Sequence, residues 1–223
     1  MIVASLAGNV SGSHRAMIGE VGLAHRGILF FDELPHFSKN ILEALREPMQ
    51  DNKIRISRVN SKVEYPSDFL FIGAMNPCPC GNLLNEKLEC RCSDLEIQRY
   101  KNRLSDPFLD RIDLTVVMQS SNADDCPSLS SKEFHKKVVE VHIFSKNRGQ
   151  KSFNAKLNDS EIEKFCILSD EAKATLNMAV SRFALSFRAI KKIQKVSRTI
   201  ADLESCEIIQ KAHILEALSY RRR

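Results

Sequence analysis

The stretch Gly27-Ile28-Leu29-Phe30-Phe31-Asp32-Glu33 decides the fold that we predict for this chain. Four consecutive apolar residues followed by two carboxylates predict a short strand that is buried on both faces, as in a parallel α/β sheet. The carboxyl ends of such strands form the sheet edge at which ligands bind. Asp32 and Glu33 are therefore candidates for binding chemistry, and the alternative is that they cap the helix that follows.

Neighbouring apolar runs predict the rest of this sheet. Residues 69–74 and 113–118 are predicted to form two more buried strands, and residues 38–51 a helix with Pro48 near its close. Residues 53–65 alternate apolar and polar side chains, which predicts a two-stranded hairpin that turns near Asn60. Strands that alternate with helices predict an α/β fold class with a parallel sheet.

A polar stretch at residues 119–131 is the predicted domain boundary. Beyond it the sequence predicts only helices: one opened by a capping box at Ser130, one from about residue 170, one over residues 190–203, and one from about residue 211. We therefore expect an α/β domain over residues 1–120 and an all-helical domain over residues 121–223.

Composition and charge narrow the class of protein. Hydrophobic residues make up 43% of the chain and charged residues 27%, which is typical of globular proteins and excludes a disordered chain. No apolar run approaches the roughly 18 residues that span a bilayer, and the first residues lack the basic start of a signal peptide, so we expect a cytoplasmic protein. The net charge is +5, and the basic excess lies after residue 120, which indicates a polyanionic partner such as nucleotide or nucleic acid.

Two polar side chains next to the predicted strands extend the candidate site. Asn76 follows the strand at 69–74, where its amide can orient a water molecule; alternatively it only forms a turn before Pro77. Arg111 precedes the predicted strand at 113–118, and its forked, permanently charged guanidinium can reach a phosphate in a neighbouring subunit. The alternative for Arg111 is a surface ion pair with Asp110 or Asp113.

A basic helix lies in the C-terminal half. Its cations fall at helical spacing opposite an apolar stripe, which indicates either a solvated face or a phosphate contact through Arg188 with added field from the others. These cations are Arg188, Lys191, Lys192, Lys195 and Arg198.

Four cysteines cluster with the spacing C-x-C-x₉-C-x-C, at Cys78, Cys80, Cys90 and Cys92. Four thiolates within one polar loop are the ligand set of a tetrahedral Zn²⁺ site. The pattern leaves zinc and four reduced thiols about equally open, because two cysteines separated by one residue chelate a metal less comfortably than a C-x₂-C pair.

Several segments match one family in order. Residues 19–118 resemble the AAA+ module of magnesium-chelatase-like proteins of the ComM/YifB competence type, and the C-terminal half is similar to the helical lid of that family. The segments that carry the resemblance are residues 19–27, Asp32-Glu33-Leu34-Pro35, residues 42–48, Ala74-Met75-Asn76-Pro77-Cys78-Pro79-Cys80-Gly81, Pro107-Phe108-Leu109-Asp110-Arg111-Ile112-Asp113, and residues 197–203 and 213–221.

The resemblance implies a role for each candidate residue. Asp32 and Glu33 would be the Walker B pair that holds Mg²⁺ and polarises the attacking water, and Asn76 would be sensor 1. Arg111 would be the arginine finger, with Arg103 as second choice, and Arg188 the sensor 2 arginine. The hairpin at 53–65 would face the pore of a hexameric ring, where three cations contact DNA phosphates: Arg55, Arg58 and Lys62.

The resemblance also implies ATP as cofactor, and DNA remodelling or branch migration by the intact motor. The sequence contains no G-x-x-x-x-G-K-[ST] loop, which family members carry upstream of the part that is similar here. We therefore expect this chain to correspond to roughly the C-terminal half of such a protein and to be inactive alone. The alternatives are a non-catalytic regulatory or assembly module and a chelatase-type ATPase that remodels proteins.

Overall fold

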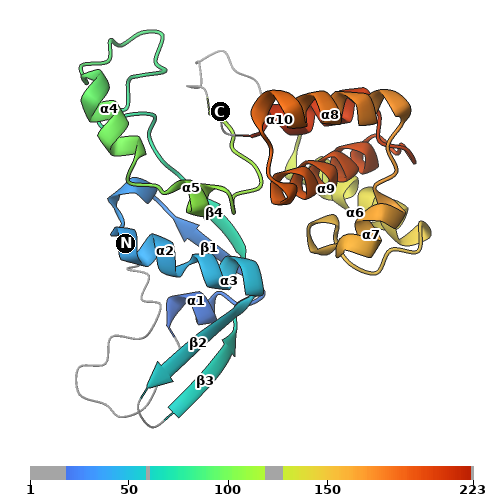
Figure 1. The fold of residues 1–223 in the computed structure, drawn as a ribbon, viewed down its shortest axis with the longest axis horizontal. Helices are drawn as coiled ribbons and strands as arrows, with labels where there is room; N and C mark the ends of the chain where they lie inside the picture. The colour runs from blue at the N-terminus through green and yellow to red at the C-terminus, as the bar shows by residue number, and fades with distance from the viewer. Residues whose placement is uncertain (1–18, 59–60, 119–127, 222–223) are drawn as a thin grey trace. The chain divides into compact units, whose positions relative to one another are not determined.

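The computed structural model describes residues 19–58, 61–118 and 128–221 (Figure 1). The chain divides into two compact units, Met1–Ile112 and Asp113–Arg223. Among the described residues, no helix has both the length and the apolar character needed to cross a membrane. The predicted turn at Asn60 and most of the predicted linker, residues 119–127, lie outside the described residues.

The first unit mixes short strands with short helices. Its elements are, in order, α1 (Glu20–Leu23), β1 (Ile28–Phe31), η1 (Leu34–His36), α2 (Lys39–Ala44), α3 (Arg46–Asp51), β2 (Lys53–Arg58), β3 (Ser61–Pro66), β4 (Leu70–Gly73), α4 (Asp94–Lys101) and α5 (Asp106–Leu109).

Two strand pairs organise this unit. β1 and β4 run parallel, with Phe31 opposite Gly73, so their carboxyl ends meet at one edge. Backbone hydrogen bonds continue past the strands, because Ala74 N–H donates to the Phe31 carbonyl (2.8 Å) and Leu34 N–H donates to the Ala74 carbonyl (2.9 Å). β2 and β3 form the antiparallel hairpin that the alternating pattern predicts, with Arg55 opposite Glu64.

The prediction that the strands are buried on both faces is wrong. Leu29 and Phe31 are buried, whereas Ile28 and Phe30 on the opposite face are 61% and 58% exposed. Within the described residues, the core of this unit, which includes Leu42, Leu45 and Phe108, packs against one face of the sheet. A run of apolar residues fits two covered faces equally well, and the number of covering layers is set by the rest of the fold.

Residues 113–118 do not form the predicted strand. Thr115 N–H donates to the Tyr220 carbonyl (2.7 Å), but no β-ladder among the described residues includes this segment, and Leu114, Val116 and Val117 are more than half exposed. A strand requires a neighbouring edge that completes its hydrogen bonds, and apolar composition alone does not supply one.

The predicted helix over residues 38–51 is divided in two. Leu45 ends α2 and precedes α3, so Pro48 lies in the first turn of the second helix rather than at the close of one long helix. The missing N–H of a proline removes no intrahelical hydrogen bond in a first turn. Ser38 occupies the N-cap position of α2, but its side chain makes no hydrogen bond to the helix.

The second unit is helical. It contains α6 (Ser131–Asn147), η2 (Asn154–Lys156), α7 (Asp159–Phe165), α8 (Asp170–Phe183), α9 (Phe187–Leu203) and α10 (Lys211–Ser219). The capping box predicted at Ser130 is confirmed, because Glu133 N–H donates to its hydroxyl and the Glu133 carboxylate accepts from its backbone. The core joins residues of α7 to α10, including Ile162, Ile193, Ile200 and Ile214.

Candidate functional site

Acidic and amide side chains gather at the carboxyl edge of the parallel pair. Asp32 and Glu33 follow β1 directly, and Asn76 lies three residues beyond β4; all three are exposed. The Asp32 carboxylate accepts a hydrogen bond from Glu33 N–H (2.9 Å). The parallel register places the ends of β1 and β4, which precede these residues in the chain, at the same edge of the sheet.

The backbone of Glu33 is strained. Its φ of 50° and ψ of 47° lie in the left-handed region, which costs a non-glycine residue roughly 1–2 kcal/mol. Such strain persists where surrounding structure enforces it and is concentrated at functional sites. An ordinary N-cap residue has an extended backbone and a side chain that accepts a hydrogen bond from the helix. Glu33 precedes η1 with a left-handed backbone, and its side chain makes no capping hydrogen bond to η1.

His36 and Tyr100 complete the surroundings of Glu33, although no sequence pattern assigned either residue to the site. His36 Nδ1 lies 3.4 Å from a Glu33 carboxylate oxygen, and the Tyr100 ring meets the His36 ring edge-on at 6.3 Å. Burial raises the pKa of Tyr100, whose hydroxyl also hydrogen-bonds the Asn76 backbone. No spacing in the sequence links Tyr100 to Asn76, because α4 makes this connection only by folding back to the sheet edge.

The two finger candidates occupy different places in the first unit. Arg103 donates to the carbonyl of Pro35 (3.4 Å), which lies two residues after Glu33 in the chain. Arg111 is turned toward α3, where it donates to the Arg46 carbonyl (3.1 Å) and to Gln50 Oε1 (2.8 Å). The structure therefore brings Arg103, rather than Arg111, to the turn beside the acidic pair.

The hairpin cations have acidic neighbours. Arg55 forms ion pairs with Glu64 (3.3 Å) and Glu47 (3.4 Å), and Lys53 forms one with Glu64 (2.7 Å). Hydrogen bonds from Lys53 and then Arg55 lower the pKa of Glu64. Lys62 is exposed. The Arg58 backbone pairs with Ser61, and its side chain lies outside the described residues.

The basic helix α9 does not present one continuous cationic face. Arg188 is exposed in its first turn, but Lys191 pairs with Asp159 (2.6 Å) and Lys192 with Asp113 (2.8 Å). Lys195 donates to the Ala155 carbonyl (3.0 Å). Much of the positive charge predicted for this face therefore has an acidic or carbonyl partner within the second unit.

Arg198 is a core residue, which corrects its assignment to the basic face. Its side chain is fully buried and pairs with Asp202 (3.0 Å), whose carboxylate also binds Arg148 (2.6 Å). The Arg198 guanidinium donates to the Glu207 and Cys206 carbonyls as well. Helical spacing predicted Arg198 opposite the apolar stripe with the other cations, but the turn after α9 folds over it.

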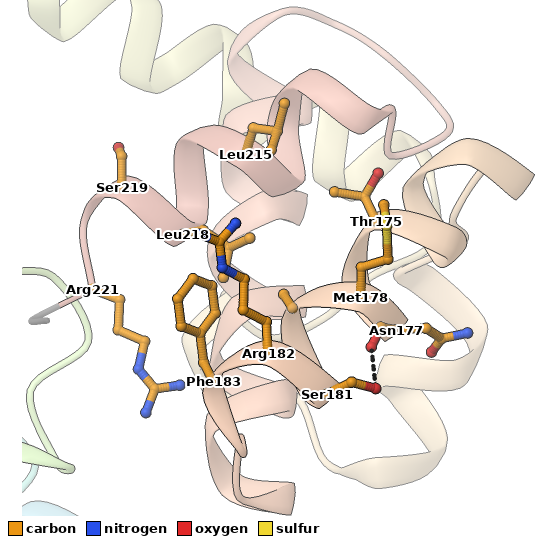
Figure 2. Close-up of a pocket in the computed structure, with 11 residues that line it drawn as sticks. Thr175, Asn177, Met178, Ser181, Arg182, Phe183, Leu215, Leu218, Ser219 and Arg221 are labelled. Atoms are coloured by element: carbon orange, nitrogen blue, oxygen red, sulfur yellow. Dashed lines mark hydrogen bonds between the residues drawn. The ribbon is translucent and has the colours of Figure 1, made fainter.

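A groove in the second unit lies between α8 and α10 (Figure 2). Arg182 lies over the Phe183 ring at 5.6 Å, and Arg221 lines the same groove with Met178 and Leu218. None of the residues predicted from the sequence as functional lines this groove.

The four clustered cysteines converge. The sulfur of Cys78 lies 3.4 Å from that of Cys80 and 3.6 Å from that of Cys90, and all four sulfurs lie within 4.8 Å of one another. The backbone N–H groups of Asn82 and Arg91 donate to the Cys80 sulfur and lower its pKa to about 6. Burial raises the pKa of Cys92 to about 12.

A second group, Glu204, Cys206 and His213, is explained without a metal. His213 Nδ1 accepts from Gln210 N–H (2.9 Å), so Nε2 carries the proton and donates to Glu204 (2.9 Å). A metal on Nε2 would require the proton on Nδ1, which faces the Gln210 N–H.

The described part of the chain is thus a mixed α/β protein in which a small parallel sheet carries acidic and amide side chains at one edge, with a helical unit downstream. The chain belongs to the magnesium chelatase family: the family described as "Magnesium chelatase, subunit ChlI" matches residues 2–126, and "Magnesium chelatase, subunit ChlI C-terminal" matches residues 128–221.

Curated relatives agree with this membership. The chain is 42% identical to "Competence protein ComM" of Haemophilus influenzae and 40% identical to "Uncharacterized protein YifB" of Salmonella typhimurium, over 98% of its own length in both cases. It is 32% identical to "Uncharacterized protein Rv2897c" of Mycobacterium tuberculosis. The chain spans less than half the length of these relatives, 43% to 44%.

Proposed function

We propose that this chain is part of an AAA+ ATPase motor of the ComM type. In this proposal residues 1–120 belong to a P-loop-type core and residues 121–223 form its helical lid. The observation that carries the proposal is the parallel pairing of β1 with β4, which delivers Asp32, Glu33 and Asn76 to one sheet edge. Ligands of open α/β sheets bind at that edge.

Each residue at the edge has a proposed role in phosphoryl transfer. Asp32 would hold Mg²⁺ through its water shell, Glu33 would polarise the attacking water, and Asn76 would orient that water. Arg188 would contact the γ-phosphate as sensor 2. Arg111 would act in trans as the finger in a hexameric ring, and the contact of Arg103 with the turn after Glu33 makes Arg103 the alternative to test.

Nucleotide binding needs a phosphate cradle that these 223 residues lack, since they contain no G-x-x-x-x-G-K-[ST] loop. The test is ATP turnover by this chain alone and by this chain mixed with the part of the Haemophilus relative that it does not match. We expect turnover only in the mixture. Glu33→Gln should lower that turnover at least about a hundredfold, because general-base groups contribute 10²–10⁴.

The exposed Glu89→Gln is the matched control and should leave turnover unchanged. Turnover by this chain alone would contradict our account of the missing phosphate loop. A mixture that binds but does not hydrolyse ATP would instead favour the second candidate function, a non-catalytic regulatory or assembly module, which the missing loop motivates.

We further propose that the complete motor works in the cytoplasm and couples hydrolysis to DNA remodelling or branch migration, with Arg55, Arg58 and Lys62 of the hairpin touching DNA phosphates. The similarity to a competence protein supports this choice of substrate. Lys62→Glu should weaken DNA binding by the mixture and reduce its dependence on salt, because fewer counterions are released. Lys132→Glu, the same charge change in α6, should not. Equal DNA binding by both variants would favour a chelatase-type motor that remodels proteins.

A further inference from the structure

The segment between β4 and α4 is held by a few local hydrogen bonds and has no apolar core of its own. Residues 74–93 form no helix or strand, and Cys78 is the one buried side chain within residues 75–99, all of which the structure describes. Leu84 and Leu88 are 60% and 57% exposed, so no apolar core stabilises the segment. Short segments without a core are ordinarily ordered by a disulfide or a bound metal.

The sulfur geometry distinguishes between these two. A disulfide places its sulfurs about 2.05 Å apart, whereas the separations here are 3.4 Å for Cys78–Cys80, 3.6 Å for Cys78–Cys90 and 3.6 Å for Cys80–Cys90. Four Zn–S bonds of about 2.3 Å in a tetrahedron separate neighbouring sulfurs by about 3.8 Å. The observed separations are close to that value.

The backbone around the cysteines also suits a metal-thiolate site. N–H groups of Asn82 and Arg91 donate to the Cys80 sulfur, and such bonds stabilise the negative charge that a bound thiolate carries. Gly81 adopts φ of +83°, which lets the chain turn tightly after Cys80, and its N–H donates to the Cys78 carbonyl (3.1 Å).

We propose that Cys78, Cys80, Cys90 and Cys92 bind one structural Zn²⁺ ion, and that this ion fixes the segment carrying Asn76 against α4. The site is closed, since four protein ligands leave no coordination position for a substrate. An iron–sulfur cluster fits less well, because several iron and sulfide ions between the thiolates would hold the cysteine sulfurs farther apart.

The metal site is connected to the sheet edge by two short paths. Cys78 lies two residues after Asn76, and Cys92 immediately precedes the capping box of Ser93 and Glu96 that opens α4. α4 in turn presents the buried Tyr100, which hydrogen-bonds the Asn76 backbone. Zinc would therefore complete a connection from Asn76 through the cysteines to α4, and from Tyr100 of α4 back to the Asn76 backbone. The metal site stands independently of the proposed function; only its value for catalysis rests on that function.

The test measures metal content in the full chain, purified under reducing conditions from zinc-supplemented cells. We expect one zinc per wild-type chain and its loss in Cys90→Ser and in Cys92→Ser. The matched control is Cys206→Ser, which replaces a half-buried cysteine of the second unit and should retain the zinc. Cobalt added to the zinc-free chain should produce the visible absorption bands of tetrahedral thiolate coordination.

Hydrogen exchange then tests the connection. Removing zinc should accelerate exchange in residues 76–100 while leaving α8 and α9 unchanged, which separates local loosening from global unfolding. Three outcomes would overturn the proposal: wild-type chain without zinc and without cobalt bands, stoichiometric iron in place of zinc, or zinc retained by both Cys90→Ser and Cys92→Ser. Unchanged exchange in residues 76–100 on zinc removal would overturn the link to Asn76. None of these results depends on ATP turnover.

Discussion

Glu33 and Ala184 are both held in the left-handed region of backbone conformation, with φ of 50° and 46°. Ala184 ends α8, a position at which glycine is strongly preferred because it has no Cβ. At Ala184 no side-chain chemistry accounts for the strain. At Glu33 a glycine would relieve the same strain, but it would also remove the carboxylate that the proposed function needs.

Ala184→Gly is expected to raise the free energy of unfolding by about 1 kcal/mol, because it relieves the left-handed strain. Urea unfolding followed by circular dichroism measures the change. Ala174→Gly is the matched control: Ala174 is exposed in the middle of α8, and glycine there should lower stability by about 1 kcal/mol. If both substitutions destabilised the chain, the left-handed conformation of Ala184 would be contradicted.

At the scale of the element, α9 contains cations of two kinds. Arg198 and Asp202 are both fully buried and paired, whereas the pair of Lys191 with Asp159 lies at the surface, where Asp159 is 73% exposed. Breaking a buried pair leaves an uncompensated charge in a low dielectric, whereas a surface pair contributes little.

Arg198→Met should therefore lower the free energy of unfolding by about 3 kcal/mol or more. Lys191→Met, which likewise replaces a cation with methionine seven residues earlier on the helix, should lower it by less than about 1 kcal/mol. Thermal and urea unfolding of the two variants measure this difference. Equal losses would mean that Arg198 does not occupy the buried position described above.

A second interaction between elements ties α2 to α5. The Ser105 hydroxyl and then Arg46 hydrogen-bond the Glu43 carboxylate and lower its pKa below the ordinary value of 4.5. A carboxyl whose pKa is lower in the folded state stabilises the fold above its unfolded pKa, and this contribution disappears as the pH falls through the folded value.

The stability difference between the wild-type chain and Glu43→Gln should thus be constant above about pH 5.5 and shrink as the pH falls below 4.5. Urea unfolding at a series of pH values from 7 downward measures it. A difference that persists unchanged under acidic conditions would show that the Glu43 carboxylate is not held by these partners.

At the scale of the whole molecule, the two units bury their apolar residues to different extents. The helical core contains buried residues from α7, α8, α9 and α10, while the sheet of the first unit leaves Ile28, Phe30 and Leu70 exposed on one face. Hydrophobic burial is the dominant favourable contribution to stability, so the units should differ in local stability.

Backbone amides of α9 are accordingly expected to exchange hydrogen more slowly than those of β1 and β4. Hydrogen exchange with mass spectrometry on the full chain resolves these segments. Protection of β1 equal to that of α9 would mean that the exposed face of the sheet is covered in solution.

Local signals predicted the elements well. The apolar runs gave β1 and β4, alternation gave the hairpin, and the capping box gave the start of α6, because each of these depends on residues close together in the chain. Residues 113–118 fit the same apolar pattern and fail, since a strand also needs a partner edge. Tyr100 and His36 were missed for a related reason: their relation to Glu33 exists only after α4 and η1 have folded.

The sequence by itself therefore determined the family, the order of the elements and the presence of carboxylates, an amide and four cysteines at defined spacings. Only the tertiary structure decided which face of the sheet is buried, that Arg198 belongs to the core, that Arg111 is turned toward α3, and that four sulfurs come within 4.8 Å of one another. The physical reason is that spacing fixes which residues can share an element, whereas burial and charge compensation depend on partners that distant parts of the chain provide.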